Sequence, residues 1–262
     1  MRLSVISLSD AHARREHAAA QLDAAGIEFD FLDAVRGEDI LADESFRSYD
    51  ATRFFLNTGR LPSNGELGCF ASHRLLWRRC VEIDEPVLVL EDDVELHGDF
   101  RAAVEEVARH IGEYGFIRLQ EEYRASRFPV VRCGRFTLSR YRKASYGTAC
   151  YAISPAVARS FIARSGCFRA PVDLFIKNFW EHGQPLYALT PYTASLSGLS
   201  RLSAMHGRRK RRSTRITALR AATKTGWYAR RWLFNAVQIY REFPGWPGKA
   251  RARLLQLAAL DD

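Results

Sequence analysis

The segment Pro86 to Leu96, PVLVLEDDVEL, constrains the fold of this chain more than any other. Its branched apolar run, Val87 to Leu90, is typical of a strand that is buried on both faces in an α/β protein. Three consecutive carboxylates follow that strand, namely Glu91, Asp92 and Asp93. Because adjacent like charges repel, such a cluster is tolerated when a cation or a row of hydrogen-bond donors meets it. Ligands of open α/β sheets bind at this end of the strands. The segment therefore predicts a ligand site, with a solvated acidic turn as the alternative.

Side-chain alternation along a strand assigns a direction to each carboxylate. Glu91 and Asp93 are expected to point one way and Asp92 the other. Two hard oxygen ligands on one side suit Mg²⁺ or Mn²⁺, which keeps several waters and shares oxygens of a bound phosphate. The sequence thus predicts a divalent cation site at Asp93 and Glu91.

The beginning of the chain has the pattern of a βαβ unit. Leu3 to Leu8 is predicted to form a strand, and Ala11 to Ala25 a helix with Asp10 as its N-cap and Gly26 as its stop. Glu28 to Val35 alternates as a second strand. This opening favours a parallel sheet with right-handed crossovers.

Further elements follow from periodicity and capping signals. Residues 37–62 are polar and irregular, and residues 66–83 have apolar side chains at helical spacing on one face. His73 lies on that apolar face, where a hydrogen-bonded histidine is more common than a ligand. The other predicted elements are a helix over 100–111, a strand over 115–119, β structure over 128–153, a helix opened by Ser154 and Pro155, and a helix starting near Pro171.

Length and composition limit the class of protein. A chain of 262 residues can bury one large core or two small ones. The first apolar stretch, about six residues before Asp10, is too short for a signal peptide, and no later run approaches the roughly 20 residues that span a bilayer. A soluble or peripheral protein is expected. The five cysteines contain no CxxC pair, which indicates free thiols in a reducing compartment.

Positive charge is concentrated at the C-terminal end. Residues 201–262 carry a net charge of +12 and residues 1–200 about −3, which divides the chain into a domain over 1–205 and a basic, mostly helical extension over 206–262. The extension interleaves cations with aromatic residues such as Trp227, Trp232 and Trp246. This composition favours an in-plane helix on an anionic membrane, to which each cation contributes about 1 kcal/mol. A nucleic-acid arm around Arg208 to Arg212 and a helix packed on the core are the alternatives.

Several segments, in order, resemble the family 25 glycosyltransferases, which include lipooligosaccharide galactosyltransferases of Gram-negative bacteria and collagen galactosyltransferases. The matching segments span roughly residues 4–203 and are VISLSDAHARRE, GIEFDFLDAVRG, GELGCFASH, LVLEDDVEL, GTACYAIS, PVDLF and YALTP. The resemblance implies a GT-A-like α/β fold with a single nucleotide-sugar-binding domain and a mixed, mainly parallel sheet. It also implies a nucleotide-sugar donor and a divalent metal. The chain departs from the family pattern at Ser9, where many relatives have Asp or Asn, and at Gln120, where some bacterial relatives carry a carboxylate.

The resemblance also assigns roles to the acidic segment and to one loop. A metal at Asp93 would neutralise the departing diphosphate without proton transfer. Glu91 either shares that metal or accepts hydrogen bonds from the ribose, while Asp92 holds backbone donors or a basic side chain. Gly147 and Thr148 suit a close backbone approach to the sugar or diphosphate, or else form a simple turn.

Four more residues are candidates for donor binding. Arg14 or Arg15 is placed to pair with the diphosphate, because a guanidinium matches phosphate geometry, although both could equally form a solvated helix face. Ser72 and His73 resemble the SH pair of the family, which favours a donor-site role that competes with simple packing.

An inverting transfer also needs a carboxylate that accepts the proton of the acceptor hydroxyl. Asp173 is the candidate, since it is the only acid between Glu122 and Glu181 and the family pattern has Asp there. Alternatively, Asp173 only caps the helix that begins near Pro171. Glu121 and Glu122 are reserve bases, unless they are ordinary solvent-facing charges.

Together these features predict a metal-dependent glycosyltransferase that uses Mn²⁺ or Mg²⁺. The expected reaction moves galactose from UDP-galactose, with inversion, onto a lipooligosaccharide or lipopolysaccharide core. The expected partners are the UDP-sugar, a lipid-linked saccharide and an anionic membrane surface, with no nucleic acid, and the expected location is the cytoplasmic face of the inner membrane. The alternative is a non-catalytic saccharide- or membrane-binding protein with a degenerate glycosyltransferase fold, and a nucleic-acid-binding module comes third.

Overall fold

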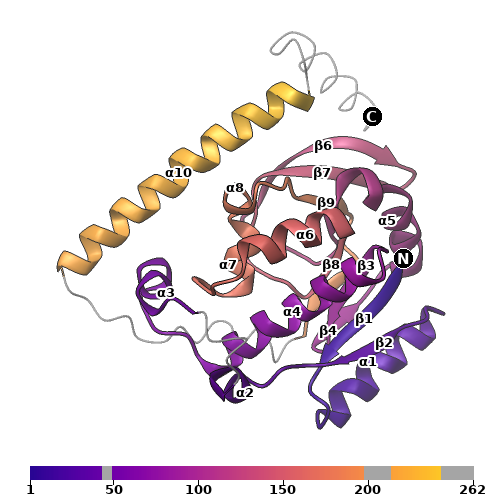
Figure 1. Cartoon of the computed structure of the whole chain (residues 1–262). Helices are drawn as coiled ribbons and strands as arrows, with labels where there is room; N and C mark the ends of the chain where they lie inside the picture. The colour runs from indigo at the N-terminus through magenta and orange to yellow at the C-terminus, as the bar shows by residue number, and fades with distance from the viewer. Residues whose placement is uncertain (43–48, 198–213, 243–262) are drawn as a thin grey trace.

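A computed structural model describes residues 1–42, 49–197 and 214–242 (Figure 1). Its centre is an eight-stranded sheet with the strand order β2-β1-β3-β8-β5-β9-β7-β6. The strands of this sheet are β1 (Arg2–Ser7), β2 (Asp30–Asp33), β3 (Val87–Glu91), β5 (Phe116–Arg118), β6 (Ser126–Cys133), β7 (Phe136–Lys143), β8 (Cys150–Ile153) and β9 (Tyr187–Thr190). A separate two-stranded ladder pairs β4 (Val94–Leu96) with β10 (Ala194–Leu196).

The sheet is mixed. β1 pairs in parallel with β2 and β3, as the βαβ pattern predicts, and β5 pairs in parallel with β9. The remaining neighbours are antiparallel, so parallel pairing prevails only around β1. One antiparallel pair is the hairpin of β6 and β7, where Gly134 adopts a φ of 58° that suits a tight turn.

Helices cover both faces of the sheet (Figure 1). They are α1 (His12–Ala24), α2 (Gly37–Ala42), α3 (Ala51–Thr58), α4 (Asn64–Glu82), α5 (Phe100–Tyr114), α6 (Pro155–Arg164), α7 (Val172–Lys177), α8 (Phe179–His182) and α10 (Thr214–Glu242). Ser154 caps α6 and Pro155 follows it at the first position, as predicted. The prediction of irregular structure over 37–62 is wrong where α2 and α3 form, because short helices carry too few residues for a clear period.

The predicted N-cap of α1 is also wrong. Ala11 occupies the cap position without a side-chain hydrogen bond, while the Asp10 carboxylate pairs with Arg36 at 2.5 Å. A tertiary ion pair has therefore taken the side chain that the local pattern assigned to the helix.

The acidic strand is buried on both faces, as its apolar run predicts. Val87 and Val89 join the core beneath α4, α6 and α7, whereas Leu88 and Leu90 join the core beneath α1 and α5. The alternation continues into the polar residues, so that Glu91 faces α4 and the next carboxylate faces β1 and α1. All five cysteines are free thiols.

The C-terminal helix α10 lies along the side of the domain, against α3 and α8 (Figure 1). Its Phe234 ring packs 5.3 Å from the ring of Phe179, and Asn235 Nδ2 donates to the carbonyl of Arg142 at 2.9 Å. This packing is what the core-packed alternative predicts. The boundary predicted at residue 205, the basic run over 208–212 and the end of the extension lie outside the described residues. Among the helices in the described ranges, none is long and apolar enough to cross a membrane.

Candidate active site

A cleft of about 320 Å³ opens at the carboxyl ends of β1 and β3. All three carboxylates of the acidic segment line this cleft, as the strand position predicts. The wall opposite them comes from the loop after β2 and from the first turns of α4. The side chains that line the cleft include Arg14, Cys69, Ser72, His73, Glu91, Asp92 and Asp93.

Glu91 is held by a directed chain of hydrogen bonds. Trp77 Nε1 donates to the Tyr151 hydroxyl at 2.9 Å, that hydroxyl meets His73 Nδ1 at 2.9 Å, and His73 Nε2 meets Glu91 Oε1 at 3.2 Å. Thr148 Oγ1 donates to the same Glu91 oxygen. Since Trp77 can only donate, a consistent chain has Tyr151 donating to His73 and the histidine Nε2–H donating to Glu91. Four residues, from α4, β8 and the loop before β8, thereby fix one carboxylate.

The same contacts keep Glu91 ionised. Burial acts to raise the pKa of Glu91, but the hydrogen bonds from His73 and Thr148 outweigh it and hold the pKa below its ordinary value. His73 is fully buried and both ring nitrogens are engaged, so it orients Glu91.

Asp92 points to the other side of the strand. Its carboxylate accepts from Ser7 Oγ at 2.5 Å and from Arg14 Nη1 at 3.0 Å, and it is almost fully buried. Of the two kinds of partner expected for Asp92, backbone donors or a basic side chain, the structure shows the basic side chain. Asp93 lies in the turn between β3 and β4, where it lines the cleft half-buried and its carbonyl accepts from Ser197 N. Arg14 is half-exposed and also lines the cleft, which leaves guanidinium nitrogens available to a ligand.

Arg15 and Ser72 have internal partners. Arg15 donates to the carbonyls of Ser7 and Leu8 at 3.0 Å and pairs with Asp33, so it ties the end of β1 to β2. Ser72 is fully buried, donates to the carbonyl of Gly68 and accepts from Val35 N at 2.8 Å. Ser72 therefore fastens the loop after β2 to α4, and both residues shape the cleft from behind.

A neighbouring side chain leaves room only for glycine at position 147. The φ of Gly147 is +121°, and a Cβ there would lie 2.2 Å from Gln120 Nε2. Gln120 is buried, and its Oε1 accepts from the backbone N–H groups of Ala149 and Cys150 at 2.6 and 3.2 Å. Gln120 thus stabilises the loop that presents Thr148 to Glu91.

Two groups of three residues have the spacing of metal ligands among the described residues. Cys69, His73 and Glu91 place one ligand atom each within 4.8 Å of the others inside the cleft, and a second group lies on α5 and β6, outside it. Burial, together with the negative charges of Glu91, Asp173 and Asp93, raises the pKa of Cys69 well above its ordinary value. A neutral thiol is a poor ligand, so the carboxylate oxygens are the cleft groups that suit a cation.

Asp173 stands at the N-terminal turn of α7, partly buried. Burial raises its pKa to about 6, and the carboxylates of Glu66 and Glu91 act in the same direction, against a hydrogen bond from Leu174 N and the charge of Lys177. The Leu174 contact, at 2.6 Å, is local to the helix start. Pro171 occupies the N-cap position of α7 and no side-chain cap hydrogen bond forms, so the interpretation of Asp173 as the helix cap is wrong. The effect of Glu91 on the pKa of Asp173 indicates in addition that Asp173 lies near the cleft carboxylates.

The two reserve carboxylates have different environments. Glu122 is fully buried at the side chain, pairs with the equally buried Arg118 and accepts from Tyr192 OH at 3.1 Å. Its charge is therefore used inside the domain, unlike the solvent-facing charge that was one expectation. Glu121 is exposed and lines a second pocket of about 390 Å³, together with Gln120.

Sequence reasoning did not identify several residues that build this site. Tyr151 and Trp77 orient His73 but belong to apolar patterns that give no local signal. Glu66 forms a capping box with Ser63 at the start of α4, and its S-x-x-E spacing is a signal that could have been found.

The mixed α/β sheet carries Glu91, whose pKa its neighbours lower, at the carboxyl end of β3, near Asp173, whose pKa burial raises. Ligands of α/β sheets bind at this edge, and carboxyl groups with shifted pKa values are typical of functional sites. Residues 1–176 match the model of glycosyltransferase family 25, described as an LPS biosynthesis protein. The chain belongs to this family, as the resemblance of its motifs predicts.

Three relatives illustrate the range of the family. The chain is 31% identical over 210 residues to the lacto-N-neotetraose biosynthesis glycosyltransferase LgtE of Neisseria meningitidis serogroup B (strain ATCC BAA-335 / MC58), covering 73% of this chain and 72% of that protein. It is 33% identical over 132 residues to a glycosyltransferase 25 family member of Aedes aegypti, covering 45% of this chain but only 21% of the relative. An inactive glycosyltransferase 25 family member 3 of Homo sapiens is 30% identical over 193 residues, covering 66% of this chain and 30% of that protein.

Proposed function

We propose that this protein is a GT-A-like, metal-dependent glycosyltransferase. It transfers galactose from UDP-galactose, with inversion, to a saccharide of a lipooligosaccharide or lipopolysaccharide core. The observation that carries the proposal is the position of Asp173, a carboxyl group of raised pKa near the acidic cleft and near the second pocket. A base between a donor site and an acceptor site is what an inverting transfer requires.

The acidic cleft is the proposed donor site. The carboxylate oxygens of Asp93 and Glu91 suit a hard divalent cation, Mn²⁺ or Mg²⁺, and Glu91 is held ionised by its neighbours. When bound, such a cation neutralises the departing diphosphate. Arg14 adds a guanidinium beside Asp92, where it can pair with a phosphate oxygen. Ser72, His73 and Thr148 hold the loop and the Glu91 carboxylate in position.

Asp173 is the proposed base. Its pKa of about 6 leaves it mostly ionised at neutral pH, yet basic enough to accept a proton from an acceptor hydroxyl as the sugar is transferred. Glu122 has a structural role in this proposal, because its charge is balanced by Arg118 inside the domain. Glu121 is left as a group that can contact an acceptor.

The helix α10 is the proposed membrane contact. Large side chains on it are exposed, among them Tyr228, Trp232 and Tyr240, and cations such as Arg230 and Arg231 accompany them. Aromatic and basic side chains together suit an anionic lipid surface, which would bring the protein to a lipid-linked acceptor on the inner face of the inner membrane. No nucleic acid is expected to bind.

The alternative is a non-catalytic saccharide- or membrane-binding protein, which the human relative named as inactive keeps open for this family. An assay of UDP release from UDP-galactose, with and without Mn²⁺, distinguishes the two. A catalyst releases UDP with Mn²⁺ and loses that activity in EDTA. Failure to turn over several UDP-sugars, with the protein folded, would favour the non-catalytic alternative.

A further inference from the structure

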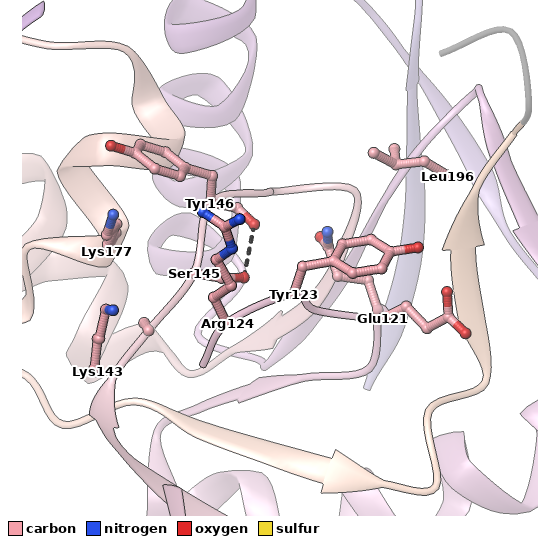
Figure 2. Close-up of a pocket in the computed structure, with 10 residues that line it drawn as sticks. Glu121, Tyr123, Arg124, Lys143, Ser145, Tyr146, Lys177 and Leu196 are labelled. Carbon is pink, nitrogen blue, oxygen red and sulfur yellow. Dashed lines mark hydrogen bonds between the residues drawn. The ribbon is translucent and has the colours of Figure 1, made fainter. Parts of the chain in front are cut away.

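The second pocket contains features that the donor chemistry does not use (Figure 2). It is formed by the segment after β5, the segment after β7, α7 and the end of β10. Figure 2 shows Lys143, Lys177 and Tyr146 on one side of the pocket, and Tyr123 and Glu121 on the other. The pocket therefore has its two lysines at one end and its carboxylate at the other, with a tyrosine at each end.

Its charged lining is predominantly positive. Arg124, Lys143 and Lys177 are the cations, and Glu121 is the one carboxylate among the described lining residues. Glu121 lies on the opposite side from the two lysines (Figure 2). Like charges in one pocket repel, so three cations are most stable together when an anion joins them.

Two tyrosines offer flat surfaces beside these cations. Tyr123 is 67% exposed and Tyr146 is 57% exposed, although large aromatic side chains usually lose more of their surface to the fold. The Lys177 ammonium lies 3.6 Å from the centre of the Tyr146 ring, which holds the ring and the cation together at the rim. An apolar ring next to a cation is a surface that suits the C–H face of a sugar carrying a negative group.

The backbone at Arg124 is in an uncommon conformation. Its φ is 63°, in the left-handed region that an arginine rarely adopts. Residues held in such conformations cluster at ligand sites, where the surrounding structure compensates the local cost. Here the conformation belongs to the segment that carries Tyr123 and Arg124 into the pocket.

Asp173 connects this pocket with the donor cleft. Its charge acts on Tyr146 and Lys177 on the pocket side, and on Cys69 on the cleft side. The carboxylate that the proposed reaction requires as its base therefore lies within electrostatic range of both sites.

We propose that the second pocket is the acceptor site, and that it selects a saccharide bearing an oxyanion, which Lys143, Lys177 and Arg124 bind while Tyr123 and Tyr146 contact the sugar rings. This inference rests on the proposed transferase function and adds the chemical class of the acceptor. Phosphate and carboxylate groups share the required chemistry, because both accept charge-assisted hydrogen bonds from lysine and arginine.

The test compares matched sugars on the whole chain by ligand-observed NMR titration. The probes are glucose, glucose 6-phosphate, glucuronate and inorganic phosphate, and UDP binding is measured in parallel with Mn²⁺. Glucose 6-phosphate or glucuronate is expected to bind more tightly than both glucose and inorganic phosphate. The two anionic sugars distinguish phosphate from carboxylate as the recognised group.

Lys143→Gln is the first variant, because Lys143 is exposed and its loss should not affect folding. Arg109→Gln on α5 is the matched control, since it removes one exposed positive charge that does not line the pocket. Lys143→Gln should weaken anionic-sugar binding about tenfold, the value of one charge-assisted hydrogen bond, while Arg109→Gln should not. Arg124→Asn, which tolerates the left-handed backbone, provides a second test of the same kind.

Several results would overturn the inference. The inference fails if glucose and the two anionic sugars bind equally well, or if inorganic phosphate binds as tightly as glucose 6-phosphate. It also fails if both pocket variants bind the anionic sugars with unchanged affinity. If UDP binds with Mn²⁺ but no anionic sugar is preferred, the acceptor inference fails and the proposed transferase stands. If UDP does not bind, the proposed function fails and the acceptor role of the pocket fails with it.

Discussion

Replacing Asp173 with asparagine should lower activity and raise stability at the same time. Asparagine keeps the oxygen that accepts from Leu174 N at 2.6 Å, so the start of α7 should remain intact. It removes the carboxylate whose pKa burial and the nearby Glu66 and Glu91 raise. A group that is costly to ionise in the folded protein is retained where function needs it.

The size of the stability effect follows from the pKa. A rise from 3.8 to about 6 corresponds to about 2 to 3 kcal/mol, at 1.36 kcal/mol for each pKa unit. The folded protein binds the Asp173 proton more tightly than the unfolded chain does. The free energy of unfolding of the wild type therefore falls by about the same 2 to 3 kcal/mol as the pH rises from about 4 to above 6. Below pH 4 both states are protonated and the cost vanishes. The variant has no such group, so its advantage over the wild type should grow across this window and stay constant above it.

Two measurements check the prediction. Urea unfolding of both proteins at pH 4, 5, 6 and 7 in EDTA gives the stability difference without a bound cation, whose charge would lower the same pKa. UDP release with a saturating acceptor gives the activity, which should fall roughly 10² to 10⁴-fold on loss of a positioned base. In the wild type, turnover should fall about tenfold for each pH unit below the pKa of Asp173 in the cation-loaded protein, which lies below the metal-free value of about 6, and level off above it. The variant should lose this dependence.

Particular results would refute this reasoning. Wild-type turnover in the variant would remove Asp173 from catalysis and return attention to Glu121. A stability difference that does not change between pH 4 and 7 would mean that the folded protein does not raise the pKa of Asp173. Loss of stability at every pH would indicate a purely structural role at the start of α7.

Four further predictions test other parts of the structure. Asp93→Asn should weaken Mn²⁺ binding in the presence of UDP, measured by calorimetry, and unchanged affinity would exclude Asp93 as a ligand. Glu122→Gln should cost about 3 to 5 kcal/mol in urea unfolding, because it leaves the Arg118 guanidinium buried without its counter-ion, whereas unchanged stability with lost turnover would make Glu122 a base. Burial lowers the pKa of Lys177 to about 8, so the KM for an anionic acceptor should rise between pH 7 and 9, and a flat profile would argue against its contact with the acceptor. Trp232 is 72% exposed on α10, and its replacement by Ser should reduce cosedimentation with phosphatidylglycerol vesicles without altering the melting temperature. Equal sedimentation of the variant and the wild type would argue against the membrane contact.

The sequence by itself determined the parts that depend on local pattern. The apolar run before Glu91 predicted a strand buried on both faces, and the structure places its residues alternately in two cores. The succession of β1, α1 and β2, the helix α4 and the cap of α6 follow from periodicity and capping chemistry that act within a few residues. The direction of Glu91 and Asp92 also follows, because alternation in a strand is fixed by the backbone.

Only the tertiary structure decided which distant side chains meet. Gln120 fills the space beside Gly147, Tyr151 orients His73, and Glu122 is drawn inside the domain by Arg118. No spacing in the chain encodes these contacts, because they depend on which faces of separate elements pack together.

The same limit applies to the two pockets. The sequence could name Asp173 as an acid in a suitable motif, but not its raised pKa, which comes from burial of α7 beside carboxylates of α4 and β3. Desolvation and charge proximity are properties of the assembled surface, so the candidate residues could be read from the sequence while their chemistry was set by the fold.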